Sequence, residues 1–484
     1  MQCGGNMTRT ESEPASGETI SIPKTQWITY GVLVAMNALT IFDVSKLGVA
    51  FDSIQRSTGG NGVIVQLMLV GYTLAYASAL LPAGRIGDLM GRRSVFLIGC
   101  SLFLLSSFIC AMSPNAYWLV AGRFVQGIGA GVLMPQTLGL IQRIFPPELR
   151  AKPLAMMGAC TSAVSLFGPV VAGVVMQIAG GNDSWRWLFW IDVVVGVIVV
   201  GMAYVLVKEP SSERKRGLDV VGILLLIPAV IFGVGPISLI SEGDMSSFRV
   251  LPVILIGMAF TCLFIVRERR TAACNREPIL DLTMFKFKHL GRGVLVSGFM
   301  HATATGGTLL ITISLEQYAY LNELTTALVM LPASVAMLYG ASLVARRQQN
   351  RAYAFIVWGN VLGGVSFIAV SVAFGVASAQ MLPLILGTIL IVISFGSAIS
   401  ASPNQARALI AVPDYRASVA GSSIQFAQRV GSAIGMGLVL VVYYGFGRSA
   451  VPVGGQPALG PCLAAIVVGV FLLCAAAIAQ GDHD

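Results

Sequence analysis

Long apolar segments alternate with short polar ones along almost the whole chain after residue 26. Segments of about 20 apolar residues are long enough to cross the hydrocarbon core of a bilayer as α-helices. The pattern therefore predicts an all-α polytopic membrane protein with fourteen transmembrane helices. The predicted spans are 27–51, 62–83, 94–112, 117–142, 153–179, 188–207, 218–239, 249–266, 291–318, 325–345, 353–374, 382–402, 417–445 and 458–479.

The positions of the basic residues predict how these spans are oriented. If the N-terminus is cytoplasmic, 24 of the 31 Lys and Arg residues fall in the N-terminal segment and the cytoplasmic loops, and only four fall in outer loops. Cytoplasmic loops of membrane proteins carry such an excess of Lys and Arg. We therefore expect both termini on the cytoplasmic side of a cell membrane, with residues 1–26 as a disordered tail that contains a second possible start at Met7.

The composition supports a lipid environment and argues against several functions. Hydrophobic residues make up 56% of the chain and charged residues 11%, with a mean hydropathy of +0.80, whereas soluble proteins carry about 25% charged residues. The net charge of +9 is explained by the cytoplasmic loops, so nucleic acid is not an expected partner. The eight cysteines form no CxxC pair, and no phosphate-binding loop, HExxH or GxSxG motif occurs. We therefore expect no metal, no cofactor, no ATP-driven pumping and no enzyme activity.

The most specific motif is GRIGDLMGRR, from Gly84 to Arg93, between the second and third spans. It resembles the signature loop of the major facilitator superfamily. The resemblance implies two six-helix bundles, and it assigns a cytoplasmic gate to Gly84, Asp88, Gly91, Arg92 and Arg93. GASLVARR, which begins at Gly340, is a weak echo of this loop with Val344 in place of the acid. Such an echo is typical of two halves related by duplication.

Two further segments in the first half resemble motifs of this superfamily. The fourth span contains LVAGRFVQGIGAGVLMPQ, whose Arg123 matches an arginine implicated in proton coupling. A structural ion pair is the alternative, because a charge within a span requires a partner. The fifth span contains SLFGPVVAG, which resembles a motif associated with antiporters. It depends on Gly168, Pro169 and Gly173, although the pattern differs at two neighbouring positions.

SWRWLFWIDVVVG, from Ser184 to Gly196, resembles the fourteen-helix drug:proton antiporter family. Asp192 occupies the place of an asparagine there and is either a pathway residue or a hydrated interfacial charge. The first span, IFDVSKLGVAF, keeps the acid of the family at Asp43 and departs from it at Lys46. Helical spacing predicts a cluster of Asp43, Lys46 and Arg123 with one acid and two bases. The cluster either carries the proton or is a static charge pair, and its surplus positive charge favours an anionic or zwitterionic substrate.

Other polar and aromatic residues within the spans are candidates for the transport pathway. Glu316 is either a proton or cation site or an interfacial acid, and His301 either titrates or is simply hydrogen-bonded. Arg429 either pairs with a loop acid or contributes to the gate. Gln317 matches a glutamine that is frequent in the family. The aromatic and methionine candidates for a lipophilic site, which helical spacing would equally place in the core, are Phe42, Tyr72, Tyr76, Met134, Met156 and Phe167.

Together these features predict a proton-coupled exporter of lipophilic or amphipathic compounds, such as drugs or antibiotics, that works by alternating access. The predicted partners are a small-molecule substrate, protons and the lipid bilayer, and the chain is expected to be a monomer. Export of a specific metabolite, lipid or anion is an alternative, as is a membrane sensor that no longer transports. The predicted units are a tail (1–26), a first bundle (27–207), two inserted helices with their loops (208–290) and a second bundle (291–484).

Overall fold

The computed structural model describes residues 23–60, 62–146, 149–208, 219–236, 247–274, 278–280, 282–287, 289–410, 412, 417–446 and 459–481. Within these ranges the chain forms helices and no strand, which confirms the predicted all-α class. Residues 1–22, which are most of the predicted tail, lie outside the described residues. The first helix begins at Lys24, slightly earlier than predicted.

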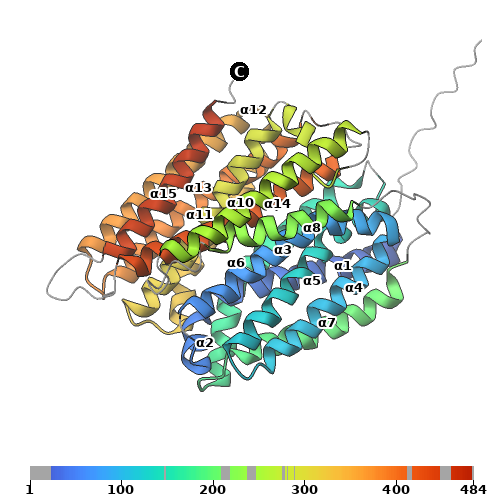
Figure 1. Cartoon of the computed structure of the whole chain (residues 1–484). Helices are drawn as coiled ribbons and strands as arrows, with labels where there is room; N and C mark the ends of the chain where they lie inside the picture. Colours follow the sequence, from blue (N-terminus) through green and yellow to red (C-terminus); the bar gives the residue numbers. More distant parts are fainter. Residues whose placement is uncertain are drawn as a thin grey trace, which may run out of the picture.

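The helices form two halves joined by an inserted pair (Figure 1). The first half contains α1 (Lys24–Lys46), α2 (Phe51–Thr58), α3 (Gly62–Met90), α4 (Arg92–Ala111), α5 (Ala116–Ile144), α6 (Ala151–Ala179) and α7 (Arg186–Leu206). The connecting region contains α8 (Val220–Val234), α10 (Ser247–Ala273) and the 3-10 helix η2 (Leu282–Lys286). The second half contains α11 (Leu290–Gln317), α12 (Glu323–Val376), α13 (Leu382–Leu409), α14 (Ala417–Gly445) and α15 (Leu459–Gln480).

Among the described residues, 11 helices are long and apolar enough to cross a membrane, or up to 12 if the bent α6 counts as one span. This confirms a polytopic membrane protein, but it does not reach the predicted fourteen spans. The difference concerns the seventh and eighth spans, where the described helices are α8, with only 15 residues, and α10. Neither of these two helices is among the 11.

One predicted boundary differs from the structure. The first span was expected to continue to residue 51, but α1 ends at Lys46, and a turn then leads into the short α2. Lys46 therefore lies at a helix end rather than inside a span. The predicted spans 325–345 and 353–374 are confirmed as two membrane-length helices, Leu324–Val344 and Arg351–Val376, which meet within α12 at a kink where Arg351 has a non-helical backbone.

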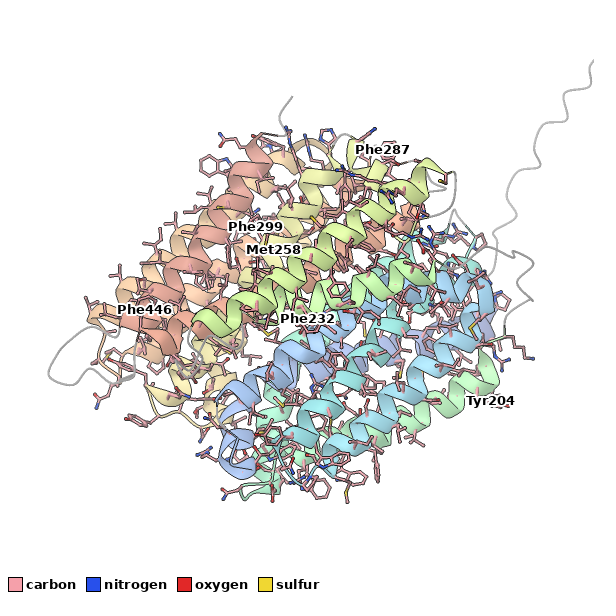
Figure 2. The ribbon with its side chains drawn as sticks, viewed as in Figure 1. Tyr204, Phe232, Met258, Phe287, Phe299 and Phe446 are labelled. Carbon is pink, nitrogen blue, oxygen red and sulfur yellow. The ribbon has the colours of Figure 1, made fainter. Side chains whose placement is uncertain are left out.

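Apolar side chains project outward from helices of both halves and of the inserted pair. Tyr204, Phe232, Met258 and Phe446 are all exposed (Figure 2). A soluble monomer rarely exposes so much apolar surface, whereas a bilayer solvates it favourably.

The two halves meet through pairs of long helices. α3 of the first half packs against α14 of the second, and α6 packs against α12. The inserted helices pack on each other, and α8 also contacts both α3 and α14 (Figure 1). Within the first half, Gly127 and Gly131 let α5 approach α3 closely, because a Cβ atom at either position would meet the backbone carbonyl of Tyr72 or Tyr76.

Candidate functional site

Four charged side chains form a buried cluster in the first half. Asp43 and Lys46 come from α1, Arg123 from α5 and Asp192 from α7, and each residue is at most 1% exposed. The Nζ atom of Lys46 lies 3.0 Å from Oδ1 of Asp43 and also forms an ion pair with Asp192. Nη1 of Arg123 lies 2.5 Å from Oδ2 of Asp43. The structure thus brings together the three residues that the sequence grouped, and it adds a fourth.

The local helix geometry explains why these groups meet. Asp43 and Lys46 are three residues apart, so they lie on one face of α1. Lys46 is the last residue of α1, where the helix dipole favours a cation, and its ammonium group donates to the carbonyl of Leu188 at 3.0 Å. Leu188 lies in the first turn of α7, and Asp192 lies one turn further along the same helix.

The predicted charge imbalance was wrong. With Asp192 included, the cluster contains two acids and two bases and is charge-balanced. Asp192 is fully buried, which contradicts one of its two interpretations, that of a hydrated interfacial charge. Burial of four charges in a helix bundle requires this pairing, because each unpaired ion would carry the full desolvation penalty.

Aromatic rings and one amide complete the surroundings of the cluster. The guanidinium group of Arg123 stacks 4.0 Å from the centre of the Tyr72 ring. The ammonium group of Lys46 lies 4.9 Å from the centre of the Phe189 ring. Gln126 accepts a hydrogen bond from Arg123 at 2.6 Å and donates to Asp43 at 3.3 Å. Gln126 was not among the predicted site residues, although its position one turn after Arg123 on the same helix places it on the same face.

The other predicted polar candidates lie elsewhere. Glu316 lies near the end of α11 and is 7% exposed. Gln317 donates to the hydroxyl of Tyr444 at 3.3 Å. His301 lies near the middle of α11, where its Nδ1 is 3.0 Å from the carbonyl oxygen of Ser297. The bundle therefore holds His301 through its own helix, as one of the two interpretations predicted.

The aromatic and methionine candidates fall into three environments. Tyr72 and Tyr76 are buried beside the charged cluster, with ring centres 6.3 Å apart. Phe42 is buried and lies against Lys46, whose ammonium group is 5.3 Å from its ring centre. Met134 packs against the apolar core of the first half. Met156 and Phe167, by contrast, are about half exposed, at 45% and 50%.

Arg429 of α14 reaches the first half across the contact between α3 and α14. Its guanidinium group lies 4.1 Å from the centre of the Tyr76 ring. Arg123 and Arg429 thus lie over two neighbouring tyrosine rings of α3. Within the part of the chain that the structure describes, no carboxylate forms an ion pair with Arg429. The predicted pairing with a loop acid is therefore not found among these residues.

The signature loop connects helices of the first half at the end predicted to be cytoplasmic. Asp88, at the end of α3, pairs with Arg92 at 2.7 Å, and Arg92 also donates to the carbonyl of Pro135 in α5 at 3.1 Å. Arg93 donates to the carbonyl of Tyr204 in α7 at 2.9 Å. The loop thus joins four helices of one half.

The glycines of this loop have different roles. Gly91 has φ of 90°, a backbone conformation that favours glycine, and α4 begins directly after it. Gly84 lies inside α3, where a Cβ atom would be 3.8 Å from the side chain of Pro135, an ordinary contact. Arg85, to which the sequence assigned no role, donates to the carbonyl of Pro278 at 2.7 Å and so connects α3 to the segment that follows α10.

The antiporter-like motif lies in the bent helix α6. Pro169 is inside this helix, and Gly168 faces α1, where a Cβ atom would meet the side chain of Ser45. Gly173 lines a pocket between the halves together with Ser53 of α2 and Asn322, which precedes α12. The motif therefore lies between the charged helix α1 and the contact with the second half.

A polar contact stabilises the inserted helices at their end near the signature loop. Glu268 of α10 is 1% exposed and accepts a hydrogen bond from the backbone N–H of Leu280 at 2.9 Å. It lies beyond the predicted span 249–266, and burial raises its pKa to about 7. Asp219, the N-cap of α8, accepts hydrogen bonds from the N–H of Gly222 and from Arg267, each at 3.0 Å.

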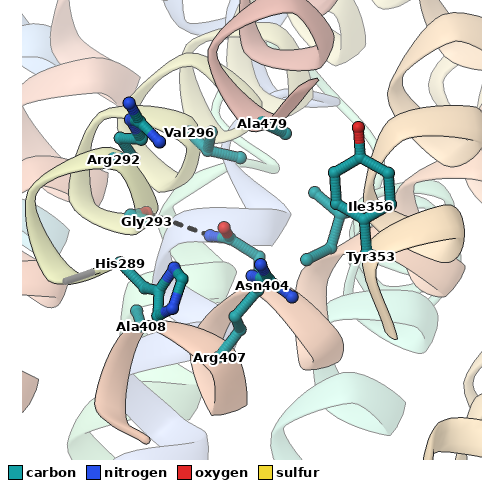
Figure 3. A pocket seen from close by; sticks show the side chains of 10 residues that line it. All are labelled: His289, Arg292, Gly293, Val296, Tyr353, Ile356, Asn404, Arg407, Ala408 and Ala479. Carbon is teal, nitrogen blue, oxygen red and sulfur yellow. Dashed lines mark hydrogen bonds between the residues drawn. The ribbon is translucent and has the colours of Figure 1, made fainter. Parts of the chain in front are cut away.

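A second pocket lies where α11 begins, at the end of α13 (Figure 3). It is lined by His289, Arg292, Tyr353, Asn404 and Arg407, among others. Asn404 closes one side by donating to the carbonyl of Gly293 at 3.0 Å. Within the described ranges, no group of three or more His, Cys, Asp or Glu side chains could hold a metal ion.

Comparisons with known proteins point to one family. A model of the Major Facilitator Superfamily matches residues 33–436. A "Probable actinorhodin transporter" of Streptomyces coelicolor is 29% identical over 319 residues, which are 66% of this chain and 55% of that protein. A "Multidrug resistance protein B homolog" of Mycobacterium tuberculosis is 27% identical over 430 residues, which are 87% of this chain and 77% of that protein. The chain thus spans little more than half of the first relative.

A solved structure shares the fold over nearly the whole chain. It is described as "Crystal structure of a POT family transporter in complex with 5-aminolevulinic acid". Its TM-score is 0.64 at 13% sequence identity, and the match covers 96% of this chain and 98% of that one. At this identity the likeness shows the arrangement of helices alone.

Proposed function

Because the chain belongs to the major facilitator superfamily, we propose that it is a proton-coupled secondary transporter that exports lipophilic or amphipathic small molecules. The family and fold are those of transporters, which are not enzymes. Within the superfamily we assign it to the fourteen-helix drug:proton antiporters, in a cell membrane and with both termini cytoplasmic. In this assignment α8 and α10 are the two additional spans. The name of the multidrug resistance relative supports a lipophilic substrate.

The observation that carries proton coupling is the charge-balanced cluster around Lys46. Its two acids and two bases are all buried, and Lys46 contacts both carboxylates. If a proton neutralises one carboxylate, the cluster holds one acid and two bases and so leaves a buried base without a partner. Such an imbalance costs several kcal/mol unless the helices rearrange or water enters. Proton binding is thereby linked to movement of α1 relative to α5 and α7.

Asp43 is our first candidate for the proton carrier. It contacts both bases, Lys46 and Arg123, so its protonation would weaken two ion pairs at once. Asp192 forms an ion pair with one base of the cluster, Lys46, which makes it the second candidate. Glu316 is more remote, because it belongs to the other half of the molecule.

Alternating access requires contacts that open and close at the two ends of the molecule. We place the cytoplasmic gate at the signature loop, whose Asp88, Arg92 and Arg93 join helices of the first half at the end predicted to be cytoplasmic. At the opposite end, the pocket between α2, α6 and the start of α12 lies between the halves and includes Gly173. The helix pairs α3–α14 and α6–α12 form the contact along which the halves would rock.

The test is transport by the purified chain in proteoliposomes with an imposed pH gradient. Ethidium and Hoechst 33342 serve as lipophilic fluorescent probes, and a protonophore dissipates the gradient as a control. Gradient-driven accumulation that the protonophore abolishes would support the proposal. Accumulation that is insensitive to the gradient would contradict proton coupling. Binding without flux would instead favour the alternative of a membrane sensor.

A further inference from the structure

Arg429 is a half-buried cation deep inside the molecule, at the contact between its halves. It lies twelve residues after the first residue of α14, about 18 Å along the helix. Its guanidinium group stacks on Tyr76, which lies near the middle of α3 in the other half. α11 packs beside it, because Cβ atoms at Gly431 and Gly435 of α14 would meet Gly298 and Ala302, which lie on either side of His301 along α11. The charge is therefore held between the two halves rather than at a membrane surface.

Among the described residues of the helices that pack most closely on α14, no acid is placed to neutralise this charge. The helices that pack against α14 are α3, α8, α11, α13 and α15. Within these helices and α14 itself, the only carboxylates are Asp88 and Glu316, each near a helix end. Asp88 lies twelve residues beyond Tyr76, and Glu316 fifteen residues beyond His301, so each is about 18–22 Å away along its helix.

The acids of the buried cluster are also unsuitable partners. Asp43 pairs with Arg123 and Lys46, and Asp192 pairs with Lys46, so both carboxylates are already occupied. Arg429 lies over the ring of Tyr76, whereas Arg123 of the cluster lies over the ring of Tyr72, one turn earlier on α3. Because the cluster is balanced, Arg429 is the surplus cation of this region.

A charge in this position is expensive unless it has a function. Charged side chains within membrane helices are rare and usually face the bundle interior or a water-filled pathway. Arginine is also the side chain best suited to bind a carboxylate, because its planar guanidinium group offers several donors. Apolar surface lies beside it, since Phe426, three residues earlier on α14, packs against the apolar cores of both halves.

We infer that Arg429 binds an acidic group of the transported compound, which is therefore a lipophilic anion or zwitterion with its apolar body against Tyr76 and Phe426. This inference rests on the proposed transport function and specifies its substrate class. The inference also assigns the preference for anions to a different residue than the sequence did. The sequence placed the surplus positive charge at Asp43, Lys46 and Arg123, whereas the structure places it at Arg429.

The experiment compares three probes that share one apolar body and differ in charge. They are 1-pyrenebutyrate, 1-pyrenebutanol and 1-pyrenebutyltrimethylammonium, and their binding to the purified full chain in nanodiscs is measured by pyrene fluorescence. We expect the anion to bind most tightly. Since a hydrogen bond to a charged group contributes about 1.5–3 kcal/mol, Arg429→Gln should weaken pyrenebutyrate binding by about 10-fold to 100-fold. The affinity for pyrenebutanol should change by less than about threefold.

Two variants control for the loss of charge and for folding. Arg429→Lys keeps the positive charge and should retain part of the preference for pyrenebutyrate. Arg407→Gln removes one positive charge from the distant pocket at the end of α13 and should leave all three affinities unchanged. Thermal unfolding of each variant identifies any that do not fold. If Arg429→Gln does not fold, the probe affinities of Arg429→Lys are compared with those of the wild type instead.

Several results would overturn the inference. These are equal affinity for the three probes, preference for the ammonium probe, binding of none of them up to millimolar concentration, or an anion preference that survives Arg429→Gln. Failure of the proposed function is distinguishable, because binding requires no gradient. Anion-selective binding without gradient-driven flux would refute transport and keep the anion site. Gradient-driven flux without anion preference would support transport and refute the anion site.

Discussion

The ammonium group of Lys46 and the carboxylate of Asp192 form a fully buried ion pair that joins α1 to α7 across 146 positions of sequence. Loss of one partner leaves the other as an uncompensated buried charge, which typically costs about 3–5 kcal/mol. Loss of both partners removes one acid and one base, so the remaining Asp43–Arg123 pair stays balanced.

The first prediction follows from this balance. Lys46→Met should lower the free energy of unfolding by about 3–5 kcal/mol, and Lys46→Met combined with Asp192→Asn should recover most of the loss. Denaturant or thermal unfolding in detergent measures both. As a control, Asp183→Asn breaks an exposed pair with Arg186 and should cost about 1 kcal/mol or less. A double variant as unstable as the single one would refute the pairing argument.

The second prediction concerns the proton carrier. Asp43→Asn keeps the size of the side chain but removes the group that takes up the proton, so it should abolish gradient-driven accumulation in proteoliposomes. Probe binding should persist, because Tyr76 and Arg429 are unchanged. Asp183→Asn serves as the matched control for loss of an acid, since Asp183 is exposed and lies outside both the cluster and the gate. If coupling survives Asp43→Asn, Asp192 becomes the better candidate.

The third prediction tests the close contact of α5 with α3. At Gly127 a Cβ atom would meet the backbone carbonyl of Tyr72, and backbone cannot move aside as a flexible side chain can. Gly127→Ala should therefore lower the free energy of unfolding by about 1–3 kcal/mol. Gly201→Ala is the control, because a Cβ atom added there would have nothing within 4 Å and alanine favours a helix. Equal unfolding midpoints for the two variants would contradict the close approach.

The fourth prediction is a pH dependence of stability. Burial raises the pKa of Glu268 from 4.5 to about 7, so the folded protein binds this proton more tightly than the unfolded chain does. The stability contributed by the protonated form is therefore present below pH 4.5 and is lost as the pH rises to about 7. Glu268→Gln has no ionisable group at this position, so the variant does not lose this stability as the pH rises. The variant should gain stability relative to the wild type between pH 4.5 and 7, as thermal unfolding across that range would show.

Asp219 provides a comparison of opposite sign. Burial tends to raise its pKa, but hydrogen bonds from the N–H of Gly222 and from Arg267 outweigh burial and hold the pKa below the usual value. The stability that Asp219 contributes is present above its unfolded pKa and is lost as the pH falls below about 4. Asp219→Asn should therefore change how the free energy of unfolding depends on pH in the acidic range. Above about pH 5, this free energy should vary with pH in the variant as it does in the wild type. A change confined to neutral pH would contradict this assignment.

Much of the fold follows from the sequence because its physical basis is local. Length and hydropathy identify membrane helices without tertiary information, which is why the spans outside 218–266 are recovered. The contact between Asp43 and Lys46 was predictable for the same reason, since both lie on one helix face. The end of α1 was harder to place, because the following turn and α2 are also apolar.

The identity of the fourth charged residue could not be read from the pattern. Asp192 lies in a helix that is apolar on nearly every side, so periodicity does not show which face meets α1. The position of Arg429 on Tyr76 likewise depends on how two distant helices pack across the two halves. Contacts of this kind are tertiary, and hydropathy carries no information about them.

The two neighbouring tyrosines of α3, Tyr72 and Tyr76, have a thermodynamic consequence. Arg123 and Arg429 lie 4.0 Å and 4.1 Å from the centres of two rings that are themselves 6.3 Å apart. The proposed sites for the ligand, at Arg429, and for the proton, at the cluster, are thus close enough to share a coupling free energy. Such coupling is reciprocal: the factor by which a ligand changes the affinity for the proton equals the factor by which the proton changes the affinity for the ligand. An equilibrium titration with either the ligand or the proton therefore measures the coupling factor for both.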